Sequence, residues 1–391
     1  MSSDFTVQWK SSMDEIDKDA WNRLTAANET PFYDWDWLRL LESSGSIQPE
    51  NGWTPVHGTV WSGSRLVACA PLYVKTHSMG EFVYDFAWAD VAAQLNIDYY
   101  PKLVGTCPAT PSGSYSLFCD PDYPQAAELL YIRIMGLAKE RRYGGVSFLF
   151  VNGDWVPEMT AKGFGEWKHQ SYLWTNRGFA SFDDYLALFS KGQRRNIRRE
   201  TASMESQGIA IRPLWIEDSN PEQRRFLYEM YDNTNSQFGP WAARFLTPSF
   251  FFRLHEIGGR RILLFLAEET VTGAPVAVSL LVVKGERMFG RYWGTRSFVK
   301  NLHFVLCYYE PIRYAIEHGI SYFDPGAGSP HKLRRGFEAV PVSSLHWFSD
   351  PMMNRVFSTY MPKINTEEEQ TIDIMNSQVP LSPRKTDWFE K

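Results

Sequence analysis

Residues 287–337, RMFGRYWGTRSFVKNLHFVLCYYEPIRYAIEHGISYFDPGAGSPHKLRRGF, carry the pattern that decides the fold. Alternating apolar positions predict a strand over 287–294, and the apolar run that follows predicts a helix over 302–318, ending at Gly319. Pro311 removes one backbone hydrogen bond from this helix and predicts a kink. A short buried strand, 320–323, then enters a turn rich in glycine and proline. A strand, a helix and a strand in this order are typical of an α+β domain.

The elements before this stretch follow the same plan in each half of the chain. The first half is predicted to contain helices 14–25, 31–41 and 125–142 and strands 54–61, 65–75 and 146–151. The second half adds helices 181–207, 221–234 and 248–257 and strands 209–214, 262–268 and 275–284. We therefore expect an α+β protein of two domains, residues 1–165 and 166–364, followed by a C-terminal tail over 365–391, which is polar and interrupted by proline.

Composition excludes several classes of function. The 391 residues include 40 Lys and Arg against 45 Asp and Glu, a formal charge of −5, which argues against a protein that binds duplex DNA. No apolar run is long enough to span a membrane and no secretory signal is visible, so we expect a cytoplasmic protein. The 4 cysteines contain no CxxC pair, so neither a disulfide framework nor a metal site is expected.

Several motifs occur together and in a fixed order. They are Gly290-Arg-Tyr-Trp-Gly294, Leu302-His-Phe304, Phe323-Asp-Pro-Gly-Ala327, His331-Lys-Leu333 and Arg335-Gly-Phe337, with Tyr99-Tyr-Pro-Lys-Leu103 and Asn196-Ile-Arg-Arg199 upstream. In these motifs the chain resembles the FemAB-like peptidoglycan-biosynthesis family over residues 30–350. The resemblance implies two tandem GNAT-type acyltransferase domains with a cleft between them. It also implies transfer of an acyl or aminoacyl group to an amine.

The chain departs from the family pattern at three places. The family usually reads Gly-Ala-Gln-Gly-Glu-His-Lys where residues 326–332 read GAGSPHK. A family carboxylate is Val305 here, and a family glutamine is Glu310. These changes predict either another acceptor or a protein that binds its ligand without catalysis.

A basic stripe lies on the helix predicted over 181–207. Its five cations recur at helical spacing, with apolar residues on the opposite side: Lys191, Arg194, Arg195, Arg198 and Arg199. We interpret the stripe as a wall that binds the phosphates of the donor. The alternative is a solvated helix face.

The segment 324–337 combines glycines with titratable groups. His331 is a candidate base for the acceptor amine, because the ordinary pKa of histidine lies near neutral pH. Lys332 and Arg335 are candidates to pair with a phosphate or carboxylate. Asp324 is either an acid/base group or a turn cap, and His303 is either catalytic or a core histidine.

Further residues are candidates to line the substrate cleft. They are aromatic or charged and lie in the motifs described above: Arg291, Tyr292, Trp293, Tyr308, Glu310, Tyr99, Tyr100 and Lys102. Packing as an aromatic ladder is the alternative for those on the strand.

The sequence before the helix predicted over 302–318 bears on the identity of the donor. GNAT enzymes that use acyl-CoA bind its pyrophosphate in a glycine-rich turn, but residues 295–302, TRSFVKNL, contain no glycine. We therefore favour aminoacyl-tRNA as co-substrate, bound by its acceptor end, with an amine-bearing acceptor and no further cofactor. The alternatives are an acyl-CoA-dependent N-acyltransferase of small-molecule metabolism and a non-catalytic module that binds a cell-wall precursor or peptide.

Overall fold

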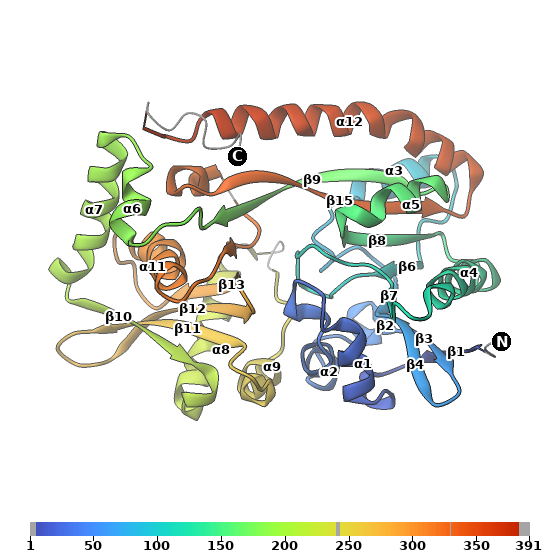
Figure 1. The fold of residues 1–391 in the computed structure, drawn as a ribbon, viewed down its shortest axis with the longest axis horizontal. Helices are drawn as coiled ribbons and strands as arrows, with labels where there is room; N and C mark the ends of the chain where they lie inside the picture. The colour runs from blue at the N-terminus through green and yellow to red at the C-terminus, as the bar shows by residue number, and fades with distance from the viewer. Residues whose placement is uncertain (1–4, 240–242, 329, 383–391) are drawn as a thin grey trace. The chain divides into compact units, whose positions relative to one another are not determined.

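The computed structural model describes residues 5–239, 243–328 and 330–382, which form two compact units (Figure 1). Unit 1 comprises Met1–His169, Phe245–Phe250 and Pro341–Glu369, and unit 2 comprises Gln170–Arg244, Phe251–Val340 and Gln370–Lys391. The chain passes between the units within strands β9 (Gly165–Thr175) and β15 (Glu338–Phe348). Each unit is thus assembled from three segments, whereas we predicted two continuous domains.

Unit 1 contains two groups of paired strands. One group has the order β1-β3-β4-β7, and the other runs from β15 through β8, β6 and β5 to β2. The strands are β1 (Phe5–Lys10), β2 (Trp53–Pro55), β3 (His57–Ser62), β4 (Arg65–Ala70), β5 (Leu72–Lys75), β6 (Lys102–Gly105), β7 (Phe118–Cys119) and β8 (Gly145–Val151). The helices are α1 (Lys18–Thr25), α2 (Trp35–Ser43), α3 (Phe86–Gln94), α4 (Pro124–Glu140) and α5 (Val156–Ala161).

Unit 2 is built on strands in the order β10-β11-β12-β13-β14-β9. They are β10 (Ile209–Trp215), β11 (Ile262–Glu269), β12 (Pro275–Lys284), β13 (Arg287–Thr295) and β14 (Tyr322–Asp324), together with β9. The helices are α6 (Phe182–Ala187), α7 (Lys191–Ser206), α8 (Pro221–Ser236), α9 (Pro248–Arg253), α10 (Leu302–Phe304) and α11 (Glu310–Glu317).

Helices cover both faces of these strands, with α8 and α11 on opposite sides (Figure 1). Strand β12 is buried along most of its length, as expected of a strand covered on both faces. On one face, Ala277 and Leu281 join the core that contains Leu306, and Ser279 Oγ donates to the Leu306 carbonyl at 3.1 Å.

The helix predicted over 302–318 has a break in its hydrogen bonding. Between α10 and α11, residues Val305–Tyr309 form a π-helical turn, η8. Pro311 lies at the start of α11, where its missing N–H is tolerated best. The kink at Pro311 stays a prediction, and the irregularity that the structure shows is a π turn just before Pro311, a feature often found at functional sites.

The helix predicted over 181–207 is instead two helices, α6 and α7. Ser181 caps the first, since its side chain accepts the Asp184 N–H, and Ser190 caps the second through the Gln193 N–H. Between them, the Ser190 N–H donates to the Pro380 carbonyl at 2.9 Å, so a later segment pairs with the break.

The prediction of a C-terminal tail over 365–391 is wrong for much of that stretch. Helix α12 (Pro351–Ser377) runs through residue 377, and Ile372, Met375 and Val379 are buried in the core of unit 2. Ile372 and Met375 lie three residues apart on α12, and Val379 follows just beyond its end, so the last part of the helix and the residues after it are buried together. Residues 383–391 lie outside the described part of the chain. Among the residues that are described, no helix has the length and apolar character needed to cross a membrane.

Candidate active site

Strands β13 and β14 pair over a short distance. They run parallel and pair at three positions, the last being Phe289 with Asp324. Next to this point β13 contains a bulge: Leu281 of β12 pairs with Gly290 and Leu280 pairs with Tyr292, which leaves Arg291 as the extra residue. Bulges re-aim side chains and are common beside active sites. We refer to the bulge in β13 and the segment that follows β14, residues 290–292 and 325–337, as the unit 2 opening.

The turn after β14 is held by charged side chains. Asp324 Oδ1 accepts the Gly326 N–H at 2.7 Å, and Asp324 Oδ2 accepts from Arg291 Nη2 at 3.3 Å. Lys332 Nζ donates to the carbonyls of Gly326 and Ala327 at 2.6 and 2.9 Å. Asp324 therefore caps the turn, one of the two roles left open by the sequence. Lys332, which we expected to contact phosphate, is directed inward and ties the turn down.

The backbone of this turn explains its glycine. Gly326 has a φ of 77°, and a Cβ there would lie 2.7 Å from the Gly290 carbonyl oxygen. Only glycine fits such a close approach in the left-handed region. Lys332 is 1% exposed, and this burial lowers the pKa of Lys332 to about 8.

A histidine and a tyrosine meet beside the turn. The Tyr308 hydroxyl and His331 Nε2 are 3.0 Å apart. Burial and, to a smaller extent, the charges of Arg335 and Lys332 lower the pKa of His331 to about 4, so the ring is neutral at pH 7. Our expectation of a near-neutral pKa is therefore wrong, because it ignored burial and these cations. Burial raises the pKa of Tyr308, whose hydroxyl stays protonated.

His303 lies next to this pair. Its ring is 4.4 Å from the Trp293 ring and 5.6 Å from the His331 ring, measured between centroids. Burial, followed by the neighbouring His331, lowers the pKa of His303 to about 3. The structure thus brings His303, Tyr308 and His331 together as neutral groups.

Arg335 belongs to a buried network that the sequence did not reveal. Its Nη2 lies 3.3 Å from Glu200 Oε2, which also accepts the Tyr309 hydroxyl at 2.6 Å. Its Nη1 donates to the His331 carbonyl at 2.8 Å. We predicted Arg335 but missed Glu200. Its spacing from Ile197 and Met204 places a carboxylate on the apolar side of α7, and such a group requires a buried partner.

A cavity of about 560 Å³ lies beside these residues. It is bounded by α7, Phe304 and the turn η9 (Pro330–Arg335). Its lining side chains are Gln193, Asn196, Glu200, Phe304, Pro330, His331, Leu333, Arg334, Arg335 and Gln378. Two separate predictions, the α7 helix and the 324–337 segment, therefore meet at one cavity.

The basic stripe of α7 does not line this cavity. Lys191, Arg195, Arg198 and Arg199 are exposed and Arg194 is partly exposed, as expected for an outward face. Arg198 forms an ion pair with Asp183 at 3.0 Å and borders another cavity, of about 540 Å³, beside α6. The residues of α7 that face the candidate site are instead polar or acidic.

The other cleft candidates of unit 2 differ in position. Trp293 faces His303, whereas the Tyr292 ring packs against Tyr231 at 5.1 Å, on the side of α8. Glu310 lies 3.5 Å from Arg313, and burial raises the pKa of Glu310. Tyr308 is thus beside His331, Trp293 is beside His303, and Tyr292 is a packing residue.

The remaining candidates lie in unit 1, around a buried lysine. Lys102 Nζ donates to Glu81 at 2.8 Å and to Asp85 at 2.5 Å. Asp85 also accepts the Tyr99 hydroxyl at 2.7 Å, and the Tyr100 hydroxyl lies 2.7 Å from Ser78 Oγ. Lys102, Tyr99 and Tyr100 therefore form an internal network of unit 1.

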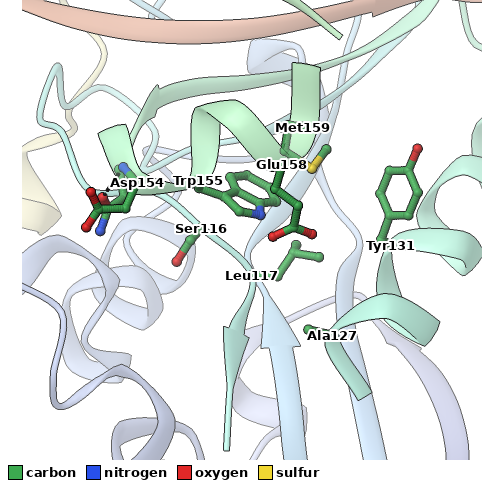
Figure 2. Close-up of a pocket in the computed structure, with 9 residues that line it drawn as sticks. Ser116, Leu117, Ala127, Tyr131, Asp154, Trp155, Glu158 and Met159 are labelled. Atoms are coloured by element: carbon green, nitrogen blue, oxygen red, sulfur yellow. Dashed lines mark hydrogen bonds between the residues drawn. The ribbon is translucent and has the colours of Figure 1, made fainter. Parts of the chain in front are cut away.

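Unit 1 has a cavity of its own, of about 290 Å³ (Figure 2). The close-up shows the Glu158 carboxylate near the Trp155 ring. Glu158 forms an ion pair with Lys162 at 2.9 Å, and the Lys162 ammonium lies 4.3 Å from the centre of the Tyr131 ring. Two of the residues that line this cavity, Glu158 and Tyr131, are thus already paired with a cation of unit 1, Lys162.

Comparisons with known proteins agree with this architecture. Residues 12–383 match the model of a family described as FemAB-like, peptidoglycan biosynthesis/recognition. The chain belongs to the FemAB-like family. The predicted family is confirmed, and the structure has the predicted α+β character with two compact units. The search of curated proteins found no match.

Solved structures share the fold of this FemAB-like protein at low sequence identity. FemX has a TM-score of 0.53 and 13% identity, covering 88% of this chain and 98% of its own. L-PGS from Bacillus licheniformis has a TM-score of 0.50 and 11% identity, covering 83% and 95%. The C-terminal domain of a putative lysylphosphatidylglycerol synthetase from Agrobacterium fabrum has a TM-score of 0.53 and 9% identity, covering 90% and 97%.

Proposed function

We propose that this FemAB-like protein transfers an aminoacyl group from an ester donor, aminoacyl-tRNA, to an amine-bearing acceptor at the unit 2 opening. The observation that carries the proposal is the His331–Tyr308 pair, 3.0 Å apart, beside a cavity of about 560 Å³. Acyl transfer to an amine requires a proton acceptor for the attacking nitrogen and a proton donor for the leaving oxygen. A neutral imidazole and a protonated phenol supply these two groups.

The proton transfers balance within this pair. When the amine attacks the ester carbonyl, a C–N bond forms and the nitrogen becomes positively charged and acidic. Neutral His331 accepts the proton of this acidic nitrogen. Its lowered pKa makes it a weak base toward an ammonium group that has not attacked the ester. The C–O bond then breaks, and the ribose oxygen takes the proton of the Tyr308 hydroxyl. Transfer of the proton from His331 to Tyr308 restores the pair.

The loop before α10 supports an aminoacyl-tRNA over acyl-CoA. A CoA pyrophosphate is bound by free backbone N–H groups at such a position. Here the N–H of Arg296 donates to the Val276 carbonyl, that of Lys300 to the Gln207 side chain and that of Leu302 to the Val299 carbonyl. These donors are already used within the protein.

The basic stripe of α7 supports the same donor. Lys191, Arg194 and Arg195 form no ion pair with any described residue. Exposed cations along one helix face suit a phosphate backbone, whose binding weakens with added salt.

The test is a transfer assay with purified protein. We would incubate it with a mixture of ¹⁴C-aminoacyl-tRNAs and an amine-bearing peptidoglycan precursor, and count label on the acceptor. We expect transfer by the native protein and a loss of about 100-fold in His331→Gln. His255→Gln, at an exposed histidine, is the matched control and should transfer normally.

Two results would contradict the proposal. Transfer from acetyl-CoA but from no aminoacyl-tRNA would identify an acyl-CoA-dependent enzyme. Tight binding of the precursor without turnover of any donor would identify a recognition module, the other half of the family description.

A further inference from the structure

The cavity beside His331 has an uneven distribution of charge. Its lining includes two arginines, Arg334 and Arg335, and one carboxylate, Glu200, while the remaining polar side chains are neutral amides and a neutral histidine. One positive charge is therefore in excess.

Arg335 also lacks one hydrogen bond. Its side chain is 4% exposed, and its Nη1 and Nη2 are used by the His331 carbonyl and by Glu200. The guanidinium carbon lies 3.5 Å from the centre of the Phe304 ring, which covers one face. Its Nε has no hydrogen-bond partner among the described residues. Nearly all buried donors are satisfied in folded proteins, so an acceptor is missing here.

Glu200 is not available to supply that acceptor. Its Oε1 accepts from Asn196 Nδ2 at 3.0 Å, and its Oε2 accepts from Tyr309 at 2.6 Å and from Arg335 Nη2 at 3.3 Å. The carboxylate thus serves three donors from three elements. The acceptor that Arg335 Nε lacks is therefore not supplied by any residue that the structure describes.

We propose that this cavity binds an oxyanion, a carboxylate or a phosphate, carried by one of the two substrates and held by Arg335 and Arg334. An oxyanion supplies the missing acceptor and cancels the excess charge. Guanidinium groups suit both anions, because their N–H donors match two oxygens at once. The evidence for an anion site, the cavity and the unpaired Arg335 Nε, does not depend on the proposed function. The claim that the anion belongs to a substrate rests on the proposed function.

The position of the site links it to the proposed reaction. Arg335 is bonded to the His331 carbonyl, so an anion bound here is anchored beside the His331–Tyr308 pair. A carboxylate would belong to an acceptor whose amine is part of an amino acid or peptide. A phosphate would belong to the nucleotide end of the donor.

Calorimetry with paired probes distinguishes these sources. The carboxylate probe is glycylglycine, with glycylglycinamide, which lacks the carboxylate, as its partner. The phosphate probe is adenosine monophosphate, with adenosine, which lacks the phosphate, as its partner, and inorganic phosphate serves as the minimal anion. We expect one probe that carries the anionic group, but not its partner without that group, to bind in low salt.

Variants test the residues. Glu200→Gln removes the competing carboxylate, and we expect the preferred anion to bind about threefold more tightly or better. The double variant Arg335→Gln/Glu200→Gln removes both charges of the buried pair. Folded proteins tolerate this far better than the loss of one charge. We expect the double variant to weaken anion binding at least about tenfold. Arg212→Gln, at an exposed ion pair with Glu268, is the control. If the double variant does not fold, Arg334→Gln tests the site instead, and we expect it to weaken anion binding about threefold.

Each outcome bears on a separate claim. Equal binding of the probes with and without the anionic group, or unchanged anion binding in the variants, would overturn the anion site even if transfer occurs. Anion binding lost as expected, with no transfer from any donor, would support the site and overturn the proposed function alone.

Discussion

Each unit contains a pair of parallel strands, but the side chains that lie beyond the end of the pair differ between the two units. In unit 1, β6 and β8 run parallel and pair at three positions, the last being Gly105 with Phe148. In unit 2, β13 and β14 also run parallel and pair at three positions. Beyond the unit 1 pairing lies Tyr115, which is 0% exposed and stacks on Phe148 at 5.7 Å. Beyond the unit 2 pairing lie a glycine turn and the His331–Tyr308 pair.

The difference shows how one arrangement can serve structure or chemistry. The Tyr115 backbone is fixed by hydrogen bonds with Phe150 and Asn152, and its hydroxyl donates to the Pro71 carbonyl at 3.1 Å. A Cβ on Gly105 would lie 2.3 Å from the Tyr115 hydroxyl oxygen, so the ring occupies this space completely. Unit 1 is therefore closed at the place where unit 2 presents polar side chains.

The largest expected effect comes from removing the ring that fills unit 1. Tyr115→Ala should cost about 3–5 kcal/mol of unfolding free energy, because it leaves a large cavity in the core. Tyr115→Phe, which loses only the bond to the Pro71 carbonyl, should cost about 1 kcal/mol. Urea denaturation measures both. The transfer rate per folded molecule should not change, and a loss of transfer in Tyr115→Phe without a loss of stability would place chemistry in unit 1.

A smaller effect is expected at the glycine turn of unit 2. Gly326→Ala should cost about 1–3 kcal/mol, because alanine is strained at a φ of 77° and meets the Gly290 carbonyl. Gly113→Ala in unit 1 is the matched control, since no atom lies within 4 Å of a Cβ there. Thermal unfolding compares the two. If both variants were equally stable, the turn would not be held as tightly as the bonds from Asp324 and Lys332 indicate.

The smallest effect concerns acid stability. Burial lowers the pKa of His331 from 6.5 to about 4, so between these pH values the unfolded chain binds a proton that the folded chain does not. The free energy of unfolding should therefore fall as the pH falls from 6.5 to about 4. His331→Gln should remove about 1 kcal/mol of this dependence, a figure reduced because the ring is half-buried. His255→Gln should not alter it, and an identical loss in both variants would exclude His331 as the source.

The sequence predicted the fold better than the chemistry. The strand limits 275–284 were predictable, because apolar periodicity acts over a few residues. The roles of Lys332 and Arg335 were not, because a cation next to glycines looks the same whether it binds a ligand or two loop carbonyls. Glu200 pairs with Arg335 across 135 residues, and one sequence cannot reveal such a contact. The lowered pKa of His331 likewise depends on burial that only the fold creates.

The central claim is that the donor binds at the unit 2 opening. Hydrogen–deuterium exchange with a non-hydrolysable aminoacyl-adenosine amide tests it most directly, since the analogue carries the reacting end of the donor. We predict slower exchange over residues 290–295 and 325–337 of unit 2 and no change over 102–118 of unit 1. Protection confined to 102–118 would contradict the account, because it would mean that the space beside Tyr115 opens to admit the donor.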